Sequence, residues 1–216
     1  MRAVVTVIIA ILITVISLGC IQHVEQQAEF DFSRYFPLNS GDSFVWSGPL
    51  GRCEVGSSVE NLFTFTFYDS LGNITRWHDF RLLTGSVRLE NIIIPSDSIY
   101  SVHFIPALQF GAWSDLTGDT TLIEAVEIRN DLDNTHARVM VGCEILGVEK
   151  VTTPAGDFDN CVKVGVTYAS LEGYTPSFLN GESAWWFAKD VGLVKYSTAH
   201  GAGNLLNAVI DGVNIP

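Results

Sequence analysis

Hydrophobic and polar residues alternate with a period of two along much of this chain, a pattern typical of half-buried β-strands. Phe63, Phe65 and Phe67, which alternate with threonines, give the clearest example. A turn-forming segment follows at residues 69–73, and a second apolar segment comes next at residues 74–82. Because a loop of this length suits a hairpin, the two segments are predicted to pair as antiparallel strands.

A second hairpin is predicted at residues 152–164. Pro154 fixes one backbone angle in its turn, and Gly156 permits a positive φ. The segment that leaves the turn alternates again, and this alternation is expected to point Phe158 into the core.

Similar short segments recur through the chain at spacings of roughly 8 to 12 residues, separated by turn residues. No segment has the capped amphipathic pattern of a helix. The pattern therefore predicts one all-β antiparallel domain, built as a curved open sheet, a barrel or a sandwich. Further strands are expected at residues 43–47, 86–93, 99–105, 122–129, 137–145, 147–152, 183–188, 192–198 and 205–210.

The first twenty residues have a different character. Met1-Arg2 is a short positive start, residues 3–18 are mostly apolar, and Gly19-Cys20 ends the run, as in an export signal. The run is at or below the roughly 17 to 25 residues of a spanning helix. Its length favours cleavage before Cys20, with diacylglycerol attached to the cysteine sulfur, over an uncleaved membrane anchor. Ser17-Leu18 is reversed relative to the bacterial lipoprotein box, whereas Gly19-Cys20 matches it.

This division gives a lipoprotein-type signal peptide at residues 1–19, a Gln- and Glu-rich tether at 20–31 and a β-domain at 32–216. The chain has 12 Lys+Arg against 24 Asp+Glu and a formal net charge of −12. Binding to nucleic acid requires a basic surface, so a nucleic-acid partner is not expected. The expected location is the cell envelope, where the lipid anchor holds the protein on the membrane.

Two predicted loops, residues 106–120 and 172–182, carry more apolar side chains than a solvated loop needs. Either both loops fold down as plugs over an open end of the sheet, or they gate a ligand, as in lipocalin-like proteins that enclose a hydrophobic molecule. The state of the interior bears on this choice, because Phe63, Phe65, Phe67 and Tyr168 either fill it or surround a cavity. The loop residues expected to contact a ligand are Phe110, Trp113, Tyr174 and Phe178.

Apart from Cys20 the chain has three cysteines, so at most one internal disulfide can form. Alternation places Cys143 on an apolar face and Cys161 on a more polar face beside Lys163. Cys53, in a predicted loop, is therefore the expected partner of Cys161. The alternative is that all three are reduced thiols.

Catalytic and metal-binding motifs are missing from the sequence: there is no Gly-x-Ser-x-Gly, His-Glu-x-x-His, Cys-x-x-Cys or phosphate-binding loop. The five histidines are isolated from one another, so no metal site and no cofactor are expected. Alternation places His78 on the opposite strand face from Asp79, which argues against a local His–Asp pair. Asp157 and Asp159 share a face beside the turn, where acids are usually solvated.

The chain carries three further segments of note: Tyr35-Phe36-Pro37-Leu38 followed by Gly41, Pro154-Ala155-Gly156 followed by Phe158 and Cys161, and Trp186-Phe187-Ala188 followed by Val191-Gly192-Leu193-Val194-Lys195. In order and spacing they resemble a broad group of uncharacterised exported bacterial proteins, many of them lipoproteins. The resemblance implies an all-β domain at the cell envelope, with the curved antiparallel sheet of periplasmic lipoprotein carriers as one form of it. It implies no catalytic residues.

These features together lead us to expect a lipid-anchored, non-enzymatic envelope protein whose β-domain binds an apolar small molecule or another envelope component. One alternative is a structural or assembly lipoprotein that acts through a protein partner. A less favoured one is a hydrolase with scattered catalytic residues, which requires a polar cleft with a histidine and a carboxylate within hydrogen-bond reach.

Overall fold

The structure, a computed structural model, describes residues 31–36, 39–56, 59–83, 85–95, 100–110, 122–130, 136–173 and 181–216. In this part of the chain it has thirteen strands and two short 3-10 helices. The elements are η1 (Phe32–Tyr35), β1 (Ser43–Trp46), η2 (Gly48–Leu50), β2 (Arg52–Val55), β3 (Leu62–Tyr68), β4 (Ile74–Leu83), β5 (Ser86–Ile94), β6 (Tyr100–Phe110), β7 (Leu122–Asn130), β8 (His136–Thr153), β9 (Gly156–Glu172), β10 (Gly181–Ala188), β11 (Gly192–Thr198), β12 (Gly201–Ile210) and β13 (Val213–Ile215).

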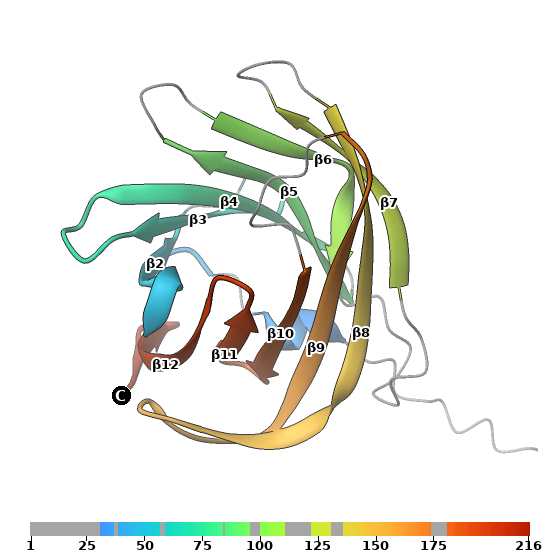
Figure 1. Ribbon diagram of the computed structural model, residues 1–216. Coiled ribbons are helices and arrows are strands. Elements are labelled where there is room, and N and C mark those ends of the chain that lie inside the picture. The colour runs from blue at the N-terminus through green and yellow to red at the C-terminus, as the bar shows by residue number, and fades with distance from the viewer. Residues whose placement is uncertain are drawn as a thin grey trace, which may run out of the picture.

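All the strands belong to one antiparallel sheet in which each strand pairs with the next one along the chain (Figure 1). The sheet curves so far that β1 also pairs with β12, with Ser43 opposite Val209 and Trp46 opposite Leu205. The predicted all-β antiparallel domain is confirmed. Its form is a single curved sheet whose ends meet, and not two sheets packed as a sandwich.

Side chains alternate between the inside and the outside of this curved sheet. On β3, Phe63, Phe65 and Phe67 are buried, while the Thr64 hydroxyl donates a hydrogen bond of 2.7 Å to Asp79 on β4. Burial of the apolar side chains stabilises the sheet, and the polar positions of neighbouring strands bond to one another on the outside. The predicted hairpin of β3 and β4 is confirmed by their pairing.

The predicted hairpin at residues 152–164 is also present, as the turn between the two longest strands, β8 and β9. Gly156 has φ +134°, and the buried Ala155 N–H donates to the Thr153 hydroxyl at 3.1 Å. The exposed carboxylate of Asp157 accepts from Lys150 at 2.7 Å. These contacts keep the turn tight, and Asp157 is solvated, as its place beside the turn predicted.

The structure corrects four details of the predicted strands. Two short strands, β2 and β13, were not expected, and β8 runs without interruption through a register shift between Ile145 and Gly147. Residues 106–110 were expected in a loop but belong to β6. Proline cannot donate to a sheet ladder, and Pro106 lies where β5 and β6 lose regular register, between the pairs Asn91–His103 and Leu89–Leu108.

The structure does not contain the expected disulfide between Cys53 and Cys161: Cys53, Cys143 and Cys161 are buried thiols. Cys53 lies on β2 and Cys161 on β9, two strands that are not neighbours in the sheet. Cys161 is buried and not on a polar face, because Asn160 has φ +55° and the register shifts there. A bulge of this kind turns a side chain to the other face. Cys143 is buried with its apolar neighbours, as predicted.

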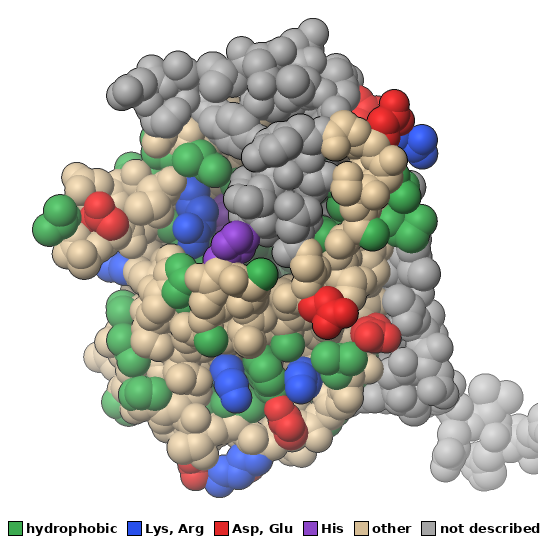
Figure 2. All heavy atoms as spheres, in the orientation of Figure 1, with side chains coloured by type: hydrophobic (Ala, Val, Ile, Leu, Met, Phe, Trp, Pro, Cys, Tyr) green, Lys and Arg blue, Asp and Glu red, His purple; other side chains and the backbone are tan. Residues whose placement is uncertain are grey.

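The proposed signal peptide, Cys20 and nearly all of the tether lie outside the described residues. Among the residues described, no helix is long and apolar enough to cross a membrane. On the face shown in Figure 2, charged side chains are scattered among apolar and uncharged ones, without a broad basic patch in the coloured part of the view.

Candidate ligand-binding cavity

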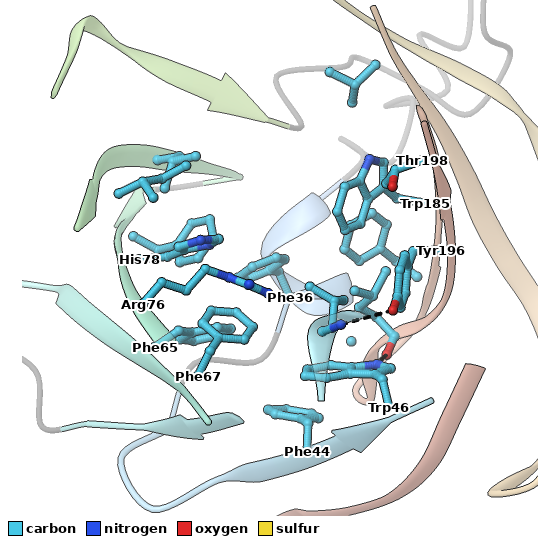
Figure 3. Close-up of a pocket in the computed structure, with 18 of the residues that line it drawn as sticks. Phe36, Phe44, Trp46, Phe65, Phe67, Arg76, His78, Trp185, Tyr196 and Thr198 are labelled. Carbon is cyan, nitrogen blue, oxygen red and sulfur yellow. Dashed lines mark hydrogen bonds between the residues drawn. The ribbon is translucent and has the colours of Figure 1, made fainter. Parts of the chain in front are cut away.

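The concave side of the sheet encloses a cavity of about 410 Å³ with a mainly aromatic and aliphatic lining (Figure 3). This volume falls within the roughly 300 to 1,000 Å³ of small-molecule sites. Both 3-10 helices and seven strands contribute to the wall. The lining residues used below are Phe36, Trp46, Leu50, Phe65, Phe67, Arg76, His78, Phe80, Val166, Tyr168, Phe187, Tyr196 and Thr198.

Helix η1 and Phe36, the residue that directly follows it, bring aromatic rings to one part of the cavity wall, called the end wall below. The ring centre of Phe36 lies 5.0 Å from that of Phe80, 5.7 Å from Phe65 and 5.9 Å from Phe187. The Asp31 carboxylate caps the helix by accepting the Ser33 N–H at 3.0 Å. Aromatic pairs at such distances attract each other beyond simple burial, so η1 forms a packed end wall.

Two of the three segments noted in the sequence, residues 35–41 and 186–195, meet at this end wall through Phe36 and Phe187, and the residues just before the first segment add further contacts. The Arg34 guanidinium pairs with the Asp190 carboxylate at 3.1 Å, and the Asp190 N–H donates to the Arg34 carbonyl at 2.6 Å. Phe187, three residues before Asp190, packs edge-on against Phe32 with ring centres 5.2 Å apart. The strand–turn–strand segment of β10 and β11 therefore holds the entry of the domain in place.

Helix η2 forms another part of the wall and is held by one tyrosine. The Tyr196 hydroxyl accepts the Leu50 N–H at 3.1 Å and donates to the Ser47 carbonyl at 2.9 Å. Nearby, the indole N–H of Trp46 donates to the Leu193 carbonyl at 2.9 Å. These polar groups of the wall are therefore engaged with the protein itself, and what the wall offers there to a ligand is apolar surface.

Arg76 and His78 on β4 are two of the polar residues in the lining, and Figure 3 shows both side chains directed into the cavity. The Arg76 guanidinium lies 4.5 Å from the centre of the Phe67 ring, a cation–π contact. Burial, aided by the charge of Arg76, lowers the pKa of His78 to about 3, so its imidazole is neutral at physiological pH. Arginine keeps its charge in proteins, and Arg76 is the one Arg or Lys among the described residues that line the cavity.

Among the described residues, the lining of the cavity contains no Asp or Glu. Asp79 lies on the outer face, where it accepts hydrogen bonds from Thr64 and Asn91. This confirms that His78 and Asp79 point to opposite faces. No group of three or more His, Cys, Asp or Glu in the described part of the chain is placed to hold a metal ion.

Of the four loop residues that were predicted to contact a ligand, the structure describes Phe110 alone. Trp113, Tyr174 and Phe178 lie outside the described residues, and Phe110 is the last residue of β6. The cavity-lining residues were instead present in the alternation of the strands: Phe65, Phe67 and Tyr168 surround open space and do not fill it. The sequence signal for Arg76 was its position on the same strand face as His78 and Phe80.

Comparisons with known proteins support the fold. A family model described as DUF3108-like matches residues 115–208, less than half of the chain. Among solved structures, a protein assigned as exported, with a YmcC-like fold, from Bacteroides fragilis NCTC 9343 superposes with a TM-score of 0.50 at 17% identity, over 84% of this chain and 99% of that chain. A protein assigned as a lipoprotein from Parabacteroides distasonis ATCC 8503 gives 0.48 at 17% identity, over 81% and 97%. No curated protein matches the chain. The chain thus shares its fold with the exported Bacteroides protein.

Proposed function

We propose that this chain is a lipid-anchored, non-enzymatic protein of the cell envelope whose β-domain binds an apolar small molecule in its cavity. The observation that carries the proposal is the cavity of about 410 Å³ and its aromatic lining. Contacts between a ligand and such a lining release water from apolar surface, which drives binding. Among the described residues the lining has no carboxylate, which favours binding over hydrolysis.

The sequence supports the envelope location. An apolar run that ends in Gly19-Cys20 is typical of an export signal followed by lipidation. The two proteins of similar fold are assigned as exported and as a lipoprotein, which agrees with this location. Two acyl chains on Cys20 would hold even an acidic domain on the membrane without help from basic residues.

Ligand binding is tested by mass spectrometry of a solvent extract of the full chain purified from its host. Val166 lines the cavity and is 1% exposed, whereas its neighbour Thr167 is exposed on the outer face. Phenylalanine at Val166 takes up cavity volume, while phenylalanine at Thr167 adds the same ring outside and serves as the control. We expect an apolar species with the wild type and Thr167→Phe, and roughly tenfold less of it with Val166→Phe.

Circular dichroism of both variants separates the loss of ligand from the loss of the fold. If no apolar species accompanies the wild type, or if folded Val166→Phe carries as much as the wild type, the cavity is not a ligand site. Recovery of one specific protein in place of a small molecule would favour the assembly role.

The anchor is tested separately with Cys20→Ser, whose hydroxyl cannot receive the thioether-linked lipid. We expect the variant to stay unprocessed or to leave the membrane fraction, measured by fractionation and intact mass. Wild-type processing together with wild-type membrane retention would show that residues 1–19 act as an uncleaved anchor and would refute lipidation.

A further inference from the structure

Arg76 presents a charge to the cavity that no carboxylate of the described residues balances. In the cavity its guanidinium lies over the face of the Phe67 ring, and it forms no ion pair with a described residue. A cation removed from bulk water without a counter-ion carries a desolvation cost, and burial accordingly lowers the pKa of this guanidinium. A charge held at such a cost inside an apolar cavity marks a place where a ligand supplies the counter-ion.

The groups that face Arg76 from the neighbouring elements are neutral. Cys53 on β2 is a thiol whose pKa burial raises well above its usual range, and Tyr196 on β11 is a phenol whose pKa is also raised by burial. His78, next along the inner face of β4, is the neutral imidazole described above. The positive charge of Arg76 is therefore not cancelled within its immediate surroundings.

The position of this charge along the cavity is set by β4. Arg76, His78 and Phe80 follow one another on the inner face of that strand, and Phe80 contacts Phe36 of the end wall at 5.0 Å. Four residues of extended strand span roughly 13 Å. The cation and the aromatic end wall thus belong to one cavity, an arrangement that matches a molecule with a charged head and an apolar chain.

We propose that the cavity binds a long-chain carboxylate, with the carboxylate paired to Arg76 and the alkyl chain directed along the aromatic lining toward Phe36. A guanidinium presents parallel N–H donors that match the two oxygens of a carboxylate. One cation balances one negative charge, which favours a carboxylate over a phosphomonoester of about −1.5 to −2. This inference rests on the proposed function, since it names the class of molecule that the same cavity holds.

The test uses the full chain in nanodiscs of zwitterionic phosphatidylcholine and a series of photoactivatable probes that share one C16 chain. The probes carry a carboxylate, a hydroxyl, a trimethylammonium or a phosphate head. Peptide mapping measures the half-saturating concentration for labelling of the cavity-lining strands. Each variant is compared with the wild type at the same probe, so that partition of the probe into the bilayer cancels.

Arg76→Met keeps most of the apolar stem and removes the charge. Arg52→Met removes an exposed charge from β2, on the outer side, and is the control for net charge. We expect Arg76→Met to weaken labelling by the carboxylate probe by about 10- to 100-fold and to leave the hydroxyl probe within about twofold. Arg52→Met should change neither, and Arg76→Lys should restore part of the loss.

The outcomes separate this inference from the proposed function. Labelling of the cavity by the carboxylate and hydroxyl probes at equal concentrations in the wild type, or equal effects of Arg76→Met on both, would overturn the role of Arg76 and leave an apolar site standing. No saturable labelling with any probe would overturn both. A preference for the phosphate head would replace the carboxylate with a phosphorylated lipid. If Arg76→Met fails to fold, the wild type alone tests the proposal. Its preference for the carboxylate probe over the other head groups should be lost at high salt.

Discussion

The hydroxyl of Tyr196 on β11 accepts the backbone N–H of Leu50 at 3.1 Å, although the two residues are 146 positions apart in the chain. The same hydroxyl donates to the Ser47 carbonyl at 2.9 Å, and Tyr196 is 2% exposed. Tyr196→Phe leaves both backbone groups without this partner. We expect the free energy of unfolding to fall by about 1 to 3 kcal/mol, measured by chemical denaturation.

Tyr168→Phe is the matched control for this substitution. Tyr168 also lines the cavity, but its hydroxyl makes no hydrogen bond with a described residue. Its removal should change the free energy of unfolding by less than about 0.5 kcal/mol. Equal losses in the two variants would mean that the phenol ring, and not the link to η2, carries the effect of Tyr196→Phe.

Gly203 on β12 lies so close to the loop before η2 that a side chain has no room. A Cβ there would stand 2.0 Å from the Ser47 carbonyl oxygen and 2.5 Å from the Tyr196 ring. Gly203→Ala should therefore cost about 3 kcal/mol or more of stability, because a backbone atom must move. In Gly165→Ala, the control, the Cβ meets the half-exposed Leu146 side chain at 3.1 Å, which can rotate away. Similar thermal midpoints for the two variants would contradict the close approach.

His78 makes the fold sensitive to acid. The pKa of His78 is about 3 in the folded protein and ordinarily 6.5. Between these two pH values the unfolded chain binds a proton at His78 and the folded chain does not. The contribution of His78 is present above about pH 6.5 and is lost as the pH falls toward 3. Through His78 the free energy of unfolding changes by at most about 1.4 kcal/mol per pH unit.

His78→Phe should remove this part of the pH dependence while keeping a ring in contact with Phe67, which lies 4.7 Å away by ring centres. The measurement is the free energy of unfolding between pH 4 and 7. An unchanged slope in His78→Phe would show that the imidazole is protonated in the folded state.

The buried cysteines should be inert in the native protein. Burial raises the pKa of the Cys161 thiol to about 11, and that of Cys53 is raised further, so few thiolates are present at pH 8. We expect iodoacetamide to modify Cys53, Cys143 and Cys161 in denaturant but not in buffer, as measured by intact mass. A native chain that gains these labels only after reduction would indicate a disulfide in the protein as isolated.

Alternation in the sequence was enough to predict most of the strands, because a sheet with one buried face repeats every two residues. It placed Phe65 and Phe67 on the inner face and separated His78 from Asp79, and the structure confirms both. Alternation failed at irregular positions. The bulge at Asn160, with φ +55°, buries Cys161 on a face where simple counting put a polar residue.

The cavity itself could not be predicted, because its volume depends on the curvature of the whole sheet. The inner faces of β3, β4, β9, β10 and β11 enclose space only once β1 has paired with β12. Arg76 belongs to no sequence motif, and its importance comes from the absence of an acidic partner among the described residues. The apolar composition of two loops instead predicted ligand contacts at residues such as Trp113 and Phe178, which lie outside the described part of the chain.

The pairing of β1 with β12 also governs when this domain can become native. Ser43 can pair with Val209 only after β12 has been synthesised. Because the N-terminal end of the chain is made first, the sheet stays open until then. Such long-range closure makes folding slow compared with proteins of local contacts. Until then the aromatic lining is exposed to water and to other chains.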